Sequence, residues 1–159
     1  MIRPLYDEDF VVAVPKRHAW ATRSAVAASE LKTETMLLLG SGHCFRDQVL
    51  EVCPEMSRFS AASDGIQRTF EGSSLETIRH MVASGIGVTV LPRSSVPVDG
   101  SGGGLTVYVP FEAPVPDRRV VLAWRKSFPR LPAIDALIEA VRASELSSVR
   151  MLDLPAQSS

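Results

Sequence analysis

Two apolar runs, each followed at once by a turn of small residues and a helical pattern, constrain the fold most. The first run, residues 36–39, leads through residues 40–42 into a stretch with no helix breaker before Pro54. The second run, residues 66–72, leads into Ser73-Ser74-Leu75-Glu76, a capping-box pattern that opens a helix. Strands that alternate with helices in this way predict an α/β fold with a mainly parallel sheet flanked by helices.

Further apolar runs complete this picture. Strands are predicted at residues 9–14, 87–91, 105–111 and 119–124, and an amphipathic helix at residues 131–146 with Ile134, Leu137, Ile138 and Val141 facing inward. Residues 1–6 are expected to form a connector. The run from Phe10 to Val14 is typical of a parallel strand buried on both faces. The helices that start near residues 43 and 74 both follow strands, so their N-termini should meet at the carboxyl edge of the sheet, where ligands bind in open α/β folds.

Composition excludes several classes of protein. The chain has 159 residues, 45% of them hydrophobic, which suits one domain, or one lobe and part of another. A net charge of −1 shows no excess of basic residues of the kind that binds nucleic acid. No apolar stretch approaches the roughly 20 residues that span a bilayer, and the N-terminus lacks a signal-peptide pattern. Two cysteines do not make a secreted disulfide scaffold, so we expect a cytoplasmic protein with reduced thiols.

The two cysteines occupy opposite ends of the first predicted helix. Cys44 falls in the first turn, where unpaired backbone N–H groups and the helix dipole favour a thiolate. Cys53 follows nine residues later, which on an intact helix means about 13.5 Å of rise, whereas a disulfide needs Cα atoms within about 7 Å. Bonding would therefore require unwinding, which is the outline of a redox switch. The alternative, two unrelated buried cysteines, stays open at this point.

The residues around this pair carry a family resemblance. The segment His43-Cys44-Phe45-Arg46-Asp47-Gln48, with Cys53 nine residues after Cys44, resembles the sensing segment of the peroxide-responsive LysR-type transcriptional regulators. The resemblance extends to residues 73–79, 85–92 and 116–119, and so covers nearly the whole chain. The segments at 73–79 and 85–92 are common to many LysR-type regulators, whereas the cysteine pair is specific to the peroxide sensors.

The resemblance implies an architecture of two lobes, similar to a periplasmic binding protein. Residues 1–118 would form the second lobe, with the redox-sensing cysteines, and residues 119–146 the C-terminal strand and helix of the first lobe. Residues 147–159 are expected to be a flexible tail. Because the DNA-binding domain, the linker helix and the first half of lobe one have no counterpart here, the chain is expected to be a fragment.

The resemblance also implies a role for each site residue. Cys44 would be the peroxidatic thiol and Cys53 the resolving thiol. Arg118 matches the arginine that stabilises the reactive thiolate, and His43 and Arg46 match residues of the peroxide pocket. Asp47 would orient the arginine or the helix turn. One departure is Thr69, where the peroxide sensors usually have a histidine.

The implied function is a redox-sensing regulatory domain rather than an enzyme, with no cofactor and no metal. Its partners would be hydrogen peroxide, a second copy in a dimer of regulatory domains (a tetramer in the full-length family), and a thiol reductant such as glutaredoxin or thioredoxin. DNA would be bound only through a domain absent from this chain, and no membrane is involved. The alternative is a LysR-type effector domain that binds a small anion or carboxylate at the two helix N-termini. A thiol enzyme is disfavoured, because no Cys/His/acid set is evident beyond the adjacent His43 and Cys44.

Overall fold

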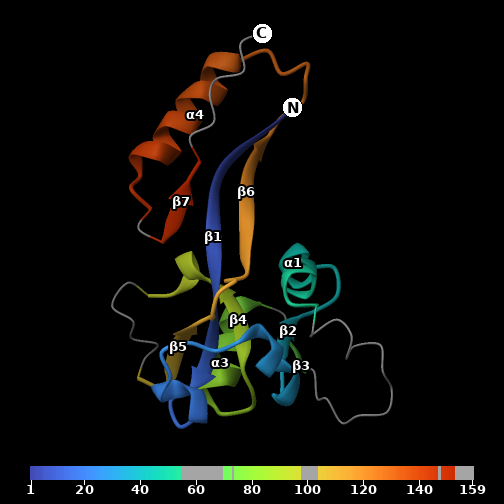
Figure 1. Ribbon diagram of the computed structural model, residues 1–159. Coiled ribbons are helices and arrows are strands. Elements are labelled where there is room, and N and C mark those ends of the chain that lie inside the picture. The colour runs from blue at the N-terminus through green and yellow to red at the C-terminus, as the bar shows by residue number, and fades with distance from the viewer. Residues whose placement is uncertain (55–69, 73, 98–103, 147, 153–159) are drawn as a thin grey trace.

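One long strand, β1 (Ile2–Pro15), runs through both halves of the molecule (Figure 1). The computed structural model describes residues 1–54, 70–72, 74–97, 104–146 and 148–152. The second half of β1 lies between β4 (Thr89–Pro92) and β5 (Thr106–Pro110). Its first half pairs with β6 (Asp117–Ala123) and β7 (Val149–Met151). All four pairings are antiparallel. The strand β1 therefore belongs to two sheet regions, one with β4 and β5 and the other with β6 and β7.

The strands that surround β1 share one direction. β2 (Leu37–Leu39) and β3 (Phe70–Gly72) pair in parallel, and a parallel bridge between Met36 and Val88 joins β2 to the approach to β4. Because β4 and β5 both run against β1, the four strands β3, β2, β4 and β5 run the same way. The predicted α/β fold is confirmed, but the prediction that residues 9–14 form a parallel strand is wrong. An apolar run reports burial on both faces and says nothing about strand direction.

The core has two layers because alternate residues of each strand point to opposite faces. On one face, α1 (Cys44–Val52) and the 3-10 helices η1 (Ala19–Thr22) and η2 (Ala28–Thr33) cover the sheet. On the other face, α3 (Leu75–Ala83) covers it, with Ile78 and Val82 buried. The first layer contains Phe10, Val12, Val14, Leu38, Val49 and Cys53, and the second contains Val11, Ala13, Leu37 and Leu39.

Local sequence sets where the two helices beside β2 and β3 begin. Gly42, with φ +94°, makes the turn before α1, and His43 is the N-cap, without a side-chain cap hydrogen bond. Before α3, the Ser74 hydroxyl accepts the Thr77 backbone N–H at 3.1 Å, so Ser74 is the N-cap. The cap lies one residue after the start of the predicted capping box, which pairs Ser73 with Glu76, and Ser73 lies outside the described residues. Gly87 is required for a different reason, since a Cβ there would overlap the Thr35 carbonyl oxygen.

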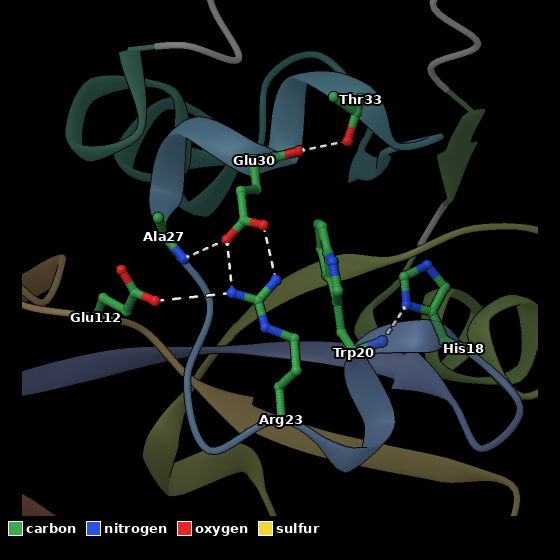
Figure 2. A network of polar contacts seen from close by, with 7 residues as sticks. All are labelled: His18, Trp20, Arg23, Ala27, Glu30, Thr33 and Glu112. Carbon is green, nitrogen blue, oxygen red and sulfur yellow. Dashed lines mark hydrogen bonds and ion pairs between the residues drawn. The ribbon is translucent and has the colours of Figure 1, made fainter.

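A polar network fastens η2 to its surroundings (Figure 2). The Arg23 guanidinium donates to both Glu30 carboxylate oxygens, at 2.7 and 3.1 Å, and holds the pKa of Glu30 below its usual value. The Ala27 N–H donates to the same carboxylate at 2.9 Å. Nearby, Nδ1 of His18 accepts the backbone N–H of Trp20 at 3.1 Å, and Nε2 of His18 lies 3.2 Å from a carboxylate oxygen of Glu34. His18 is half-buried and contacts both Trp20 and Glu34.

The N-terminal half of β1 and the C-terminal part of the chain differ from the predictions in three ways. Residues 2–6 belong to β1 rather than to a connector; the strand was not predicted because polar residues and Pro4 break the apolar alternation that usually reveals one. Residues 149–151, within the expected flexible tail, form β7 against Tyr6–Glu8, while residues 147 and 153–159 lie outside the described residues. In α4 (Leu131–Ala143), Ile138 is buried, but Leu137 is 47% exposed instead of inward.

Candidate functional site

Helix α1 presents its two cysteines to different environments. Cys44 is the first residue of α1 and is exposed. Cys53 caps the other end, where its N–H donates to the Val49 carbonyl at 2.9 Å, and its side chain has 0% exposure within the first core layer. Both thiols are free, and nine residues of helical rise separate them by about 13.5 Å. The interpretation of both cysteines as buried core residues is therefore wrong for Cys44 and right for Cys53.

Burial controls the chemistry of Cys53. Loss of solvation raises the pKa of its thiol to about 11, because a thiolate in an apolar core has no water to stabilise it. At neutral pH this thiol is protonated and enclosed, so it is a poor nucleophile in the folded state. Any reaction of Cys53 requires that the end of α1 first opens.

The other predicted residues of α1 are in three different settings. His43 is exposed at the N-cap, and Asp47 is exposed in the first turn. Arg46 is half-buried, and its Nη1 donates to the Leu39 carbonyl at 2.9 Å, which ties the start of α1 to the end of β2. The three residues thus surround Cys44 on its own helix, but only Arg46 has its direction fixed by a described hydrogen bond.

Arg118 reaches the first turn of α1 from a distant part of the sequence. Its guanidinium carbon lies 5.7 Å from the ring centroid of Phe45, the neighbour of Cys44, in a cation–π contact. Phe45 in turn meets Phe10 of β1 edge-to-face, with ring centroids 5.7 Å apart. The fold therefore brings Arg118 close to the first turn of α1, and its role beside the Cys44 thiolate stays a prediction. Within the part of the chain that the structure describes, no hydrogen bond joins Arg118 to Cys44.

Two residues that contact Arg118 in this region were not identified from the sequence. Glu8, fully buried on β1, accepts from Arg118, and Phe45 provides the aromatic face beneath the guanidinium. A signal for Glu8 does exist, because it shares strand parity with Phe10 and Val12 and so points into the same layer. Thr69, the departure from the peroxide sensors, lies outside the described residues.

The strands that precede α1 and α3 in the chain end side by side, at the sheet edge where the helix N-termini are predicted to meet. Leu39 pairs with Gly72 in the parallel register of β2 and β3, and each strand leads directly into its helix. A pocket of about 500 Å³ lies elsewhere, between residues 27–29 and 112–117, and no residue of either helix lines it. In the described residues, no group of three or more His, Cys, Asp or Glu side chains could hold a metal ion. Nor does any described helix have the length and apolar character to cross a membrane.

Comparison with known proteins identifies the family. The family model that describes the LysR substrate binding domain matches residues 2–145, and the chain belongs to this family. The solved structure of a reduced form of OxyR from N. meningitidis superposes with a TM-score of 0.86 at 42% identity. That match covers 96% of this chain and 69% of the other.

The curated relatives narrow the comparison to one group within the family. The DNA-binding transcriptional dual regulator OxyR of Escherichia coli (strain K12) is 39% identical over 88% of this chain and 44% of its own length. A hydrogen peroxide-inducible genes activator of Dickeya chrysanthemi is 39% identical over 98% of this chain and 48% of its own length. The chain thus spans about half the length of the curated relatives that it matches.

Proposed function

We propose that this chain is the peroxide-sensing part of an OxyR-type transcriptional regulator, in which Cys44 is oxidised and then bonded to Cys53. The observation that carries the proposal is the contrast between the two thiols of α1. One is exposed at the helix N-terminus, and the other is enclosed in the core at the opposite end. Similarity to hydrogen peroxide-inducible activators supports peroxide as the oxidant.

The first step is a two-electron oxidation of Cys44. Its thiolate sulfur attacks one oxygen of hydrogen peroxide, so that an S–O bond forms and the O–O bond breaks. The departing oxygen takes a proton and leaves as water, and Cys44 becomes a sulfenic acid. The N-terminus of α1 and the guanidinium of Arg118, which lies over the neighbouring Phe45, would place positive charge near the reacting sulfur. His43 and Arg46 would contact the peroxide, and Asp47 would orient this turn.

The second step joins the cysteines. The sulfur of Cys53 attacks the sulfenic sulfur of Cys44, an S–S bond forms, and the hydroxyl leaves as water after taking the proton of Cys53. Because burial keeps Cys53 protonated and about 13.5 Å of helix separates the two residues, α1 must unwind first. Burial therefore sets the order of events: oxidation of the exposed thiol comes first, and exposure of the buried thiol follows.

The remaining assignments follow from the same proposal. Residues 1–118 form the second lobe and residues 119–146 part of the first, with β1 and β6 as the strands that pass between them. The full-length protein would bind DNA through a domain outside this chain, act as a dimer or tetramer, and be reduced again by a dithiol reductant such as glutaredoxin or thioredoxin. The proposal includes no catalytic turnover and no cofactor.

Mass spectrometry tests the proposal directly. After treatment of the reduced chain with hydrogen peroxide, we expect a peptide crosslinked between Cys44 and Cys53. A Cys53→Ser variant is the matched control and should stop at the sulfenic acid of Cys44, which a dimedone adduct reveals. Hydrogen exchange should show lost amide protection across α1 in the oxidised form, with the strands of the sheet unchanged. Oxidation that leaves both thiols free, or a disulfide with α1 still protected, would contradict the proposal.

A second candidate rests on the neighbouring N-termini of α1 and α3. Both helices follow strands that end at the same sheet edge, and the backbone N–H groups of a helix's first turn suit a small anion or carboxylate. If this is the function, a carboxylate ligand should raise Tm equally in the parent chain and in a Cys44→Ser variant. A thermal shift that depends on Cys44, or no shift in a screen of small carboxylates, would exclude it.

A further inference from the structure

Glu8 is a charged residue in a place where charges are costly. It lies on β1 with 0% exposure, the single charged side chain in the buried set of the described chain. A carboxylate without water is destabilised by several kcal/mol unless it is paired and hydrogen-bonded. The proposed chemistry of Cys44 and Cys53 does not use it directly. Its partners show what the buried charge holds in place.

Three elements converge on the Glu8 carboxylate. From β6, Arg118 donates to Oε2 through Nε at 2.9 Å, and its Nη2 lies 2.8 Å from the same oxygen in an ion pair. From η3 (Arg93–Ser95), the Ser94 backbone N–H donates to Oε1 at 2.6 Å. Both oxygens are therefore satisfied, and the two donors of one edge of the guanidinium point at one fixed oxygen. This arrangement restricts the side chain of Arg118 to one orientation.

That orientation places Arg118 at the sensing segment. The guanidinium lies over Phe45, whose ring is itself fixed by Phe10 in the core. Phe45 directly follows Cys44 in the first turn of α1. A continuous set of contacts thus runs from Glu8 through Arg118 to the residue beside the exposed thiol. Without Glu8, Arg118, whose side chain is 25% exposed, is free to turn into solvent.

We infer that Glu8 is a positioning residue for the oxidation of Cys44, which acts by holding Arg118 against the first turn of α1. This inference rests on the proposed function, because it assumes that the charge of Arg118 promotes the reaction of Cys44. It extends that function to a residue that never touches peroxide. The Glu8 side chain acts only through Arg118.

The sign of the effect separates positioning from a direct action of the Glu8 charge. If Glu8 acted on Cys44 by its own negative field, removing that charge would favour the thiolate and shift its reactivity to lower pH. If Glu8 acts by holding Arg118, removing it disperses a positive charge and shifts the reactivity to higher pH. The ionisable groups described near the first turn of α1 are His43, Arg46 and Asp47 on that helix and Arg118 on β6, and of these only Arg118 contacts Glu8 and is expected to move in a Glu8 variant.

The adjacent strand position offers a matched control. Asp7 pairs with Arg119 of β6 through two hydrogen bonds of 2.7 and 2.9 Å, and the Arg119 side chain is 57% exposed. This pair joins the same two strands as Glu8 and Arg118 but points to the opposite face, away from α1. An Asp7→Asn variant therefore tests for a general effect of losing a carboxylate between β1 and β6.

The experiment is the pH profile of Cys44 alkylation in the full chain with Cys53→Ser. We expect Glu8→Gln to shift the profile up by roughly half a unit or more, and to slow peroxide oxidation at pH 7 by about three- to tenfold. Asp7→Asn should leave both unchanged. Glu8→Asp keeps the charge but is one methylene shorter, so it cannot reach both Arg118 and Ser94 and should shift the profile in the same direction. It also serves if the glutamine variant does not fold, as circular dichroism would show.

A double variant decides whether the effect passes through Arg118. In an Arg118→Ala background, Glu8→Gln should add no further upward shift, because the group that it positions is gone. An unchanged profile in Glu8→Gln, a shift to lower pH, or an upward shift that persists without Arg118 would each overturn the inference. The outcome is independent of the disulfide, since the parent chain still forms the crosslinked peptide if peroxide sensing is correct and Glu8 has no role.

Discussion

The buried thiol of Cys53 should make the folded chain sensitive to alkaline pH. Its pKa is raised from 9.0 to about 11 by burial, so the folded state holds a proton that the unfolded state loses first. The unfolded state is therefore favoured as pH rises above 9, and the loss of stability is complete once pH passes the folded value. Below pH 9 both states are protonated and the residue contributes no pH dependence.

The size of this loss follows from the shift. Two pKa units correspond to at most about 3 kcal/mol, and we expect about 2 kcal/mol between pH 9 and 11. Lysine and tyrosine side chains also titrate in this range, so the absolute stability of the chain is not informative. The difference between the parent chain and a Cys53→Ala variant isolates the thiol, because every other titration cancels.

The assay is urea unfolding at several pH values with reductant present throughout. The parent chain should lose about 2 kcal/mol more than Cys53→Ala across this range, whatever the constant cost of the cavity in the variant. A Cys44→Ser variant is the control and should follow the parent, since it keeps the buried thiol of Cys53. If the free energy of unfolding depends on pH equally in the parent and in Cys53→Ala, Cys53 is solvated in the folded state. That result would remove the basis for a fixed order of oxidation.

Three further predictions address the frame around the site. Gly87→Ala should destabilise by roughly 2–4 kcal/mol in urea unfolding, because its Cβ would overlap the backbone oxygen of Thr35 and a main-chain atom cannot rotate away; wild-type stability would refute the close approach. Ile78→Ala should cost about 2–5 kcal/mol by the same measurement, since its side chain is 1% exposed in the second core layer. Arg150→Ala should speed hydrogen exchange in β7 and leave β4 and β5 unchanged, because Arg150 joins β7 to Asp9 and Asp117; equal exchange would show that backbone pairing alone holds β7.

The sequence predicts the elements whose signals are local. Gly42 before an unbroken stretch and Pro54 after it bracket α1, and the Ser73-Ser74 pair marks the start of α3 to within one residue. The opposite positions of Cys44 and Cys53 follow from helical geometry alone. These predictions succeed because capping, turn formation and helix breaking depend on residues a few positions apart.

The parts that were not predicted depend on contacts between distant segments. The direction of residues 9–14, the strand character of residues 2–8, and β7 are all decided by partners more than 70 residues away. The same is true of Glu8, whose burial becomes explicable only when Arg118 and Ser94 arrive from other elements. A charged residue in a strand is usually exposed, and only the fold supplies the donors that allow it to be buried.

The sharing of β1 between two sheet regions has a consequence for how the sequence can change. Side chains alternate along a strand with a period of two, so one continuous strand sets the facing of residues in both regions together. Inserting or deleting one residue between Glu8 and Phe10 would turn every side chain on one side of the change to the opposite face. Either Phe10, Val12 and Val14 would move to the other core layer, or Glu8 would lose Arg118. Only an insertion or deletion of two residues would keep the side chains on both sides of the change on their present faces.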